Sequence, residues 1–149
     1  MRIVKRGTGL FALLLVVMLV FGCICTPVYA QVLNVMDYGA VGDGKTNDTA
    51  AIQACVDAMK EQGGVVTFPK GEYVVSAPIQ LYSNVQVSGI GKMSKLQSTM
   101  TGADDAIFYG EGLSGVRVTD LGFTSIGQQT AAVAQEGCSN VKIFDLEVE

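Results

Sequence analysis

Residues 34–91 read NVMDYGAVGDGKTNDTAAIQACVDAMKEQGGVVTFPKGEYVVSAPIQLYSNVQVSGIG, and this segment carries the strongest structural signals in the chain. It divides into a strand, a glycine-rich corner, one amphipathic helix and a series of very short strands. We expect the helix over about residues 47–62, because Gly63-Gly64 follows it and glycine suits a helix end. One face of this helix is apolar and should cover a core; it consists of Ile52, Cys55, Val56 and Met59.

Several side-chain oxygens lie between the corner and the helix. Asp43, Asn47 and Asp48 carry the oxygen ligands that calcium prefers, but the EF-hand spacing with its distant glutamate is missing. Turn formation and helix capping explain the same residues without a metal, and acidic Asp48 suits the positive end of a helix. We therefore predict structural roles for these residues and no metal site.

After the helix, the apolar runs are only three to five residues long. They occur at 65–68, 73–75, 79–81 and 85–87, and they are separated by glycine and proline turns. No second amphipathic helix is predicted. This pattern favours an all-β architecture, which is either a sandwich or barrel, or a coiled solenoid.

A short repeat distinguishes these alternatives. The sequence of 83–87 (SNVQV) recurs at 114–118 (SGVRV) and at 139–143 (SNVKI). The equivalent valines are Val85, Val116 and Val141, which are 31 and then 25 positions apart. A unit of this length suits one coil of a parallel β-helix, in which coils stack about 4.8 Å apart. The three valines would then form one inward ladder.

Several turn motifs stand at fixed spacing: Asp37-Tyr38-Gly39-Ala40, Gly42-Asp43-Gly44, Asp48-Thr49-Ala50-Ala51-Ile52-Gln53, Gly63-Gly64, Phe68-Pro69 and Gly71-Glu72-Tyr73. Through these motifs the chain resembles the N-terminal entry of the pectate-lyase-like superfamily, which includes rhamnogalacturonase, polygalacturonase and epimerase-like right-handed β-helices and some phage tailspikes. The resemblance covers residues 32–91 and implies the fold rather than the reaction. It makes 31–149 the N-terminal part of a right-handed parallel β-helix, with a capping helix at about 47–62 and coils from about 65.

No catalytic residue is assigned. The polygalacturonase-type hydrolases of this superfamily carry a Gly-His-Gly motif, and the chain contains no histidine. Asp104-Asp105 is similar to a pair of catalytic carboxylates, but it lies only one coil beyond the cap and is more typical of a solvated turn. The lyase alternative needs calcium-binding acids and a basic group on neighbouring coils, so calcium would enter only if the full-length protein is a lyase.

Two groups of residues are candidates for contacting a glycan. Arg117 and Lys142 hold equivalent repeat positions and would stack on one outer face, where they could meet an anionic sugar or simply be solvated. Tyrosines can stack on sugar rings, but they are also common in half-buried strands. The tyrosines in question are Tyr38, Tyr73, Tyr82 and Tyr109.

Residues 1–30 are predicted to be a signal peptide, because basic residues precede an apolar run that ends in Val28-Tyr29-Ala30. Two alternatives are a lipoprotein leader, with Cys23 lipidated, and an uncleaved anchor. Each takes the chain out of the cytoplasm, and we expect secretion. The segment after Ala30 keeps 7 basic and all 14 acidic residues, a balance of −7 without the basic stripe that nucleic-acid binding needs.

Cysteines remain at Cys55 and Cys138 after the leader, too few for a disulfide scaffold. Cys55 should be a small buried filler, and Cys138 falls in a predicted turn. Because Glu149 follows a predicted strand without a cap, we also expect the chain to be a fragment of a longer protein.

Two functions are consistent with these features. The first is the N-terminal portion of a secreted polysaccharide-acting β-helix enzyme of the pectin or uronan type, a glycoside hydrolase, lyase or epimerase. Its partner would be an acidic polysaccharide, with no membrane contact beyond the leader or a lipid anchor. The alternative is a non-catalytic surface or tailspike-like β-helix that binds glycans or serves a structural role.

Overall fold

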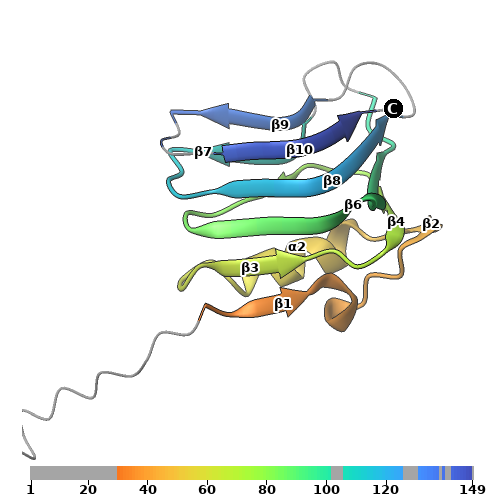
Figure 1. Cartoon of the computed structure of the whole chain (residues 1–149), viewed down its shortest axis with the longest axis horizontal. Helices are drawn as coiled ribbons and strands as arrows, with labels where there is room; N and C mark the ends of the chain where they lie inside the picture. The colour runs from red at the N-terminus through yellow and green to blue at the C-terminus, as the bar shows by residue number, and fades with distance from the viewer. Residues whose placement is uncertain (1–29, 102–105, 126–130, 138, 140–141, 149) are drawn as a thin grey trace, which may run out of the picture.

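A computed structural model describes residues 30–101, 106–125, 131–137, 139 and 142–148 of the chain. Its regular structure is mostly β, with one α-helix and one short 3-10 helix (Figure 1). No helix in these residues combines the length and apolar character that a membrane span requires. In chain order the elements are β1 (Val32–Asn34), η1 (Val35–Tyr38), β2 (Asp43–Asn47), α2 (Thr49–Asp57), β3 (Gly64–Thr67), β4 (Gly71–Val75), β5 (Ile79–Gln80), β6 (Val85–Ser98), β7 (Ala106–Glu111), β8 (Arg117–Ser125), β9 (Ala131–Glu136) and β10 (Lys142–Val148).

Every strand pairing between these elements is parallel. One ladder runs β1-β3-β6-β8-β10, a second runs β2-β4-β6-β8, and a separate sheet has the order β5-β7-β9. Figure 1 shows the first ladder as a stack of arrows from β1 to β10. The mostly β, parallel architecture with one helix is therefore confirmed.

The repeat sets the register of the stack. Gln86 pairs with Arg117, and Arg117 pairs with Lys142, which reproduces the predicted offsets of 31 and 25 residues. Val85 and Val116 are buried, as predicted, while Val141 lies outside the described residues. Residues that share a register position therefore line the core together. The aligned inward sets are Val66, Val87 and Val118; Tyr73, Leu96 and Phe123; and Ile79 and Phe108.

The predicted helix is confirmed, but it is shorter than 47–62. α2 covers Thr49–Asp57, and turns continue the chain to Gly63. Where the helix ends, its backbone hydrogen bonds change to the tighter 3-10 pattern. The N–H groups of Met59 and Lys60 donate to carbonyl groups three positions earlier. The predicted apolar face is nevertheless fully buried, including Ile52 and Met59, so the helix and its last turn cover the core.

The helix also completes the separate β5-β7-β9 sheet. Gln53 reaches the edge of β5, where its Oε1 accepts from the Gln80 N–H at 2.9 Å and its Nε2 donates to the Gln80 carbonyl at 3.2 Å. One turn earlier, the Thr49 hydroxyl accepts from the Ser76 N–H at 2.9 Å. These side chains satisfy backbone groups that a neighbouring strand would otherwise pair, so α2 occupies the place of a strand beside β5.

The structure corrects the prediction for Asp48. Asp48 stands at the N-cap of α2, but its backbone is helical (φ −92°, ψ 0°) and its side chain makes no capping hydrogen bond. Its carboxylate is 1% exposed and instead accepts from the Val41 N–H at 2.7 Å and the Gly42 N–H at 3.1 Å. A capping side chain needs an extended backbone to turn back onto the helix, and Asp48 lacks one. It therefore holds the glycine-rich corner.

Three further differences concern element bounds. Residues 43–47, predicted as corner and cap, form β2 and pair with β4 through Asp43↔Glu72 and Asn47↔Val74. The first strand ends at Asn34 because its side chain accepts from the Met36 N–H and starts η1. The short run predicted at 85–87 is the first part of β6, which extends over 14 residues. This strand pairs with β3 at 85–88, bends, and then pairs with β4 at 94–98.

Candidate functional site

The first ladder carries a polar row on its outer side. Valines on either side of Gln86 and Arg117 are buried, and side chains alternate along a strand, so Gln86 and Arg117 face outward. Gln86 is half-buried and Arg117 is exposed. Lys142 occupies the next position in register on β10. We call this register position, with its residues Gln86, Arg117 and Lys142, the basic row; the outward orientation is described for Gln86 and Arg117 alone.

A second row, which we call the hydroxyl row, lies beside it on the same outer side. Thr67, Ser88 and Thr119 are in register with one another, two residues along the strands from the basic row, and all three are half-buried. The Thr67 hydroxyl donates to the Leu33 carbonyl at 3.0 Å. The outer face of β3, β6 and β8 therefore presents hydroxyl, amide and guanidinium groups to solvent.

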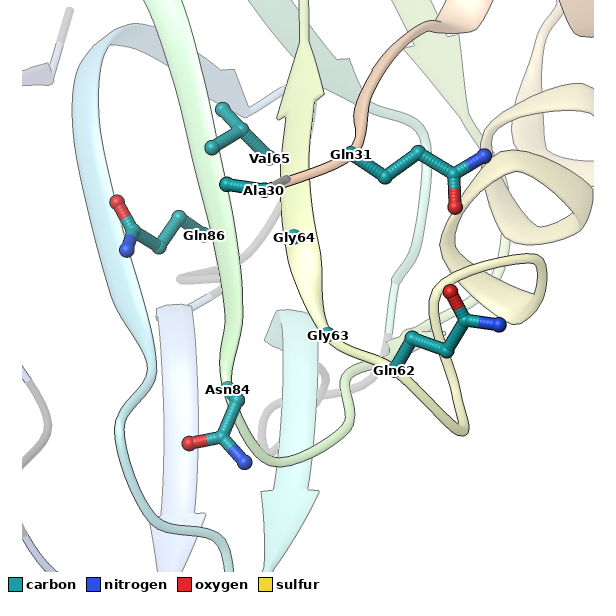
Figure 2. A pocket seen from close by; sticks show the side chains of 8 residues that line it. All are labelled: Ala30, Gln31, Gln62, Gly63, Gly64, Val65, Asn84 and Gln86. Atoms are coloured by element: carbon teal, nitrogen blue, oxygen red, sulfur yellow. The ribbon is translucent and has the colours of Figure 1, made fainter. Parts of the chain in front are cut away.

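A hollow of about 230 Å³ lies at one end of this face, where the chain enters β1. Figure 2 shows Asn84 and Gln86 on one side of it and Gln31 and Gln62 on the other, with Gly63 and Gly64 between them. Ala30 and Val65 complete its lining, and none of these described residues is acidic or basic. Gln86 belongs to both the hollow and the basic row, so the two features are continuous.

The chemistry of this face suits recognition rather than bond cleavage. The Arg117 guanidinium offers several donors in one plane, which is the geometry that a carboxylate accepts. Amides and hydroxyls donate and accept hydrogen bonds, as sugar hydroxyls do. The described part of the face holds no carboxylate pair that could act as acid and base.

Asp43, Asn47 and Asp48, for which structural roles were predicted, use their side-chain oxygens in local hydrogen bonds. Asp43 accepts from the Thr46 and Lys45 N–H groups at 2.7 and 2.9 Å, and these backbone donors lower the pKa of its carboxyl. Asn47 Oδ1 accepts from the Thr49 hydroxyl, and Asp48 accepts from the corner N–H groups. Among the described residues no cluster of acidic or cysteine side chains is placed to hold a cation. The oxygens are used by turns, so these residues do not fit calcium.

The four candidate tyrosines do not gather into one stacking surface. Tyr73 is buried, its hydroxyl donates to the Pro69 carbonyl at 2.9 Å, and burial, with the Asp48 charge nearby, raises its pKa to about 12. Tyr82 donates to Asp57 at 2.9 Å and lies under Lys60 Nζ, 5.3 Å from the ring centre. Tyr38 and Tyr109 are 36% and 38% exposed, on η1 and β7, away from the strands that carry the basic row.

The remaining candidates carry no site. Cys55 is buried, and burial, with a smaller contribution from Asp37, raises the pKa of its thiol to about 11. A thiol that stays protonated is unreactive, which confirms the prediction of a buried filler. Asp104-Asp105 and Cys138 lie outside the described residues.

Sequence reasoning identified Arg117 and Lys142 but missed Gln86, the hydroxyl row and the hollow. Gln86 occupies the position of Arg117 in the first copy of the repeat, so aligning the three copies was sufficient to find it. The hollow had no sequence signal, because Gln31, Gln62 and Asn84 meet there only after β1, β3 and β6 pair.

Comparisons with known proteins agree with this architecture. Residues 32–144 match the family model described as rhamnogalacturonase A/epimerase, pectate lyase-like. Over 82 residues the chain is 43% identical to alginate lyase 7 of Azotobacter vinelandii, a match that covers 50% of this chain and 10% of that protein. The chain thus spans only a small part of this relative's length.

Solved structures show the same fold. The A-module of mannuronan C-5 epimerase AlgE4 from Azotobacter vinelandii matches with a TM-score of 0.66 and 28% identity, over 79% of this chain and 38% of that one. ORF18 of Geobacillus virus E2 matches with a TM-score of 0.67 and 24% identity, over 97% and 29%. At that identity the second likeness is informative for fold alone.

Proposed function

The chain belongs to the rhamnogalacturonase A/epimerase, pectate lyase-like family, and from this membership we propose that it is the N-terminal portion of a longer, secreted β-helix enzyme that acts on an acidic polysaccharide. The relatives named above include an alginate lyase and a mannuronan epimerase. The proposed reaction is accordingly a lyase, epimerase or hydrolase reaction on a uronan-type polymer.

The observation that carries the proposal is the basic row. Two cationic residues, Arg117 and Lys142, share one register position on consecutive strands of a chain whose net charge is −4. Cationic residues at one register position on successive strands suit a polymer that repeats its carboxylates, because neighbouring strands lie about 4.8 Å apart. The hydroxyl row and the hollow add uncharged hydrogen-bonding groups for sugar hydroxyls.

The proposed architecture goes further than the pairing of strands. We propose that the parallel strands wind as a right-handed solenoid that continues into further coils of a longer protein, in keeping with β-helix neighbours such as the AlgE4 module. Groups that break or epimerise a glycosidic unit would lie on those further coils. In a lyase, calcium would bind there too, since Asp43, Asn47 and Asp48 already serve turns in this chain.

Export is the remaining part of the proposal. The basic start, the apolar run and its end in Val28-Tyr29-Ala30 before Gln31 support a cleaved signal peptide and secretion, with lipidation at Cys23 as the alternative route. A polymer too large to enter a cell requires an enzyme outside it. The proposed location and substrate are therefore consistent with each other.

Binding of polyanions by the exported chain tests the proposal. Alginate and polygalacturonate should bind, a neutral glucan of similar length should not, and raising the salt concentration should weaken binding. Arg117→Gln should lower the affinity about two- to fivefold, the effect of one exposed charge pair. Lys70→Gln is the matched control, because Lys70 is also exposed but lies outside the basic row.

Two results would contradict the proposal. One is equal binding to the neutral glucan, and the other is an Arg117→Gln variant that binds alginate as tightly as the unchanged protein. If a longer gene product binds uronans but leaves them intact, the non-catalytic glycan-binding alternative gains support instead.

A further inference from the structure

Gln31 is the residue through which the chain enters the fold. Its carbonyl oxygen accepts a hydrogen bond from the Val65 N–H at 2.8 Å, just before β1 begins. The contact with β3 is close at this point, because a Cβ built on Gly64 would lie 2.5 Å from the same oxygen. The backbone of Gln31 is therefore held on β3 through its carbonyl group.

The other polar groups of Gln31 are its side-chain amide and its backbone N–H. Its side chain is exposed, and neither its amide group nor its backbone N–H makes a hydrogen bond to another described residue. Figure 2 shows the side chain directed away from Ala30 and from Asn84 and Gln86 on the other side of the hollow. Both its nitrogen and its side-chain amide can thus rearrange without disturbing the pairing of β1 with β3.

We propose that Gln31 is a modification site and that the mature protein begins with a pyroglutamyl residue at this position. The inference rests on the proposed export, in which cleavage after Ala30 makes Gln31 the first residue. Its freed α-amino nitrogen then attacks the side-chain carbon Cδ. A bond forms between these atoms, the bond from Cδ to Nε2 breaks, and the amine proton leaves with that nitrogen as ammonia.

The reaction needs no oxidant, reductant or second substrate, and it preserves the contacts that hold the residue. The lactam ring does not involve the Gln31 carbonyl oxygen, so the hydrogen bond from Val65 remains. The ring nitrogen keeps one N–H, and no hydrogen bond of that group is lost. Cyclisation also removes the α-ammonium charge from the rim of the hollow, whose described lining is otherwise uncharged.

Mass spectrometry of the exported protein tests this inference. The full chain is expressed with its own leader, free amines are labelled at harvest, and the protein is then digested with trypsin. The N-terminal peptide should be residues 31–45. We expect it to be lighter than the linear peptide by one ammonia, to carry no label at its N-terminus and to lose its first residue when treated with pyroglutamyl aminopeptidase.

Gln31→Asn is the control variant. It keeps an amide and the backbone carbonyl, but its shorter side chain cannot close the same lactam, so residues 31–45 should retain a labelled amine. Labelling before digestion prevents later cyclisation from being mistaken for the cellular product. A labelled, linear Gln31 in the unchanged protein would overturn the modification while leaving export intact. A retained leader, or a lipidated start at Cys23, would overturn both the modification and the proposed signal cleavage.

Discussion

Gln53 offers a sharp test of how the helix completes the fold. Its amide makes two hydrogen bonds to the backbone of Gln80 on β5 and a third to Asp57 Oδ1 at 2.7 Å. Gln53→Met keeps the length and packing of the side chain but removes all three hydrogen bonds. Each is worth about 0.5–1.5 kcal/mol net, and water can partly replace them at this half-buried position. The expected loss in the free energy of unfolding is about 1–3 kcal/mol.

Gln53→Glu tests the donor and acceptor roles of the amide separately, because it keeps the acceptor and removes the donor. The carboxylate can still accept from the Gln80 N–H, but it meets the Gln80 carbonyl and the Asp57 carboxylate where Gln53 donated. We expect it to destabilise more than Gln53→Met at neutral pH. These neighbours should raise the folded-state pKa of the introduced Glu above its usual value near 4.3. Its deficit should therefore shrink as the pH falls through that raised pKa, and be smallest below about 4.3, where the group is protonated in both the folded and the unfolded state.

Thermal and urea unfolding measure these differences. A loss of 1 kcal/mol corresponds to a decrease of about 4 °C in Tm for a domain of this size. Gln62→Met is the matched control, since Gln62 is exposed and makes no hydrogen bond to another described residue. If Gln53→Met melts at the same temperature as the unchanged protein, the side chain does not stabilise the β5 edge and the reasoning is refuted.

Three other predictions concern the core, the pH dependence and the chemistry. Ile52→Asp places an unpaired charge at a fully buried position of α2. It should lower the free energy of unfolding by several kcal/mol, which is enough to abolish cooperative melting. Unchanged melting would contradict the covering role of the helix. Burial raises the folded-state pKa of Tyr73 to about 12, above its usual value near 10. The stability that this shift contributes is complete below pH 10 and should be lost as the pH rises toward 12. Measurements of unfolding in alkaline buffers test this pH dependence. Residues 31–149 should release no reducing ends or unsaturated uronides from pectin, galacturonan or rhamnogalacturonan, with or without calcium. Activity that disappears in an Asp104→Asn, Asp105→Asn double variant would overturn that expectation.

Two features of the fold follow from patterns along the chain. The buried face of α2 is visible as an apolar spacing, because side chains three and four positions apart share a helix face whatever they pack against. The pairing of Gln86, Arg117 and Lys142 is visible as a repeat, because a slip of one residue would turn the valines beside them out of the core. The family motifs likewise predicted the parallel, mostly β architecture.

Other features depend on contacts between distant residues. Asp48 reads as a helix cap, yet its carboxylate binds the corner N–H groups six and seven positions earlier. Gln53 reads as a solvated helix position, yet it pairs with β5 at Gln80, 27 positions away. Local preference is the same for either role, and only the tertiary packing brings an unpaired N–H or carbonyl within reach. The amino-acid order therefore specifies which residues can form hydrogen bonds, and the tertiary structure selects their partners.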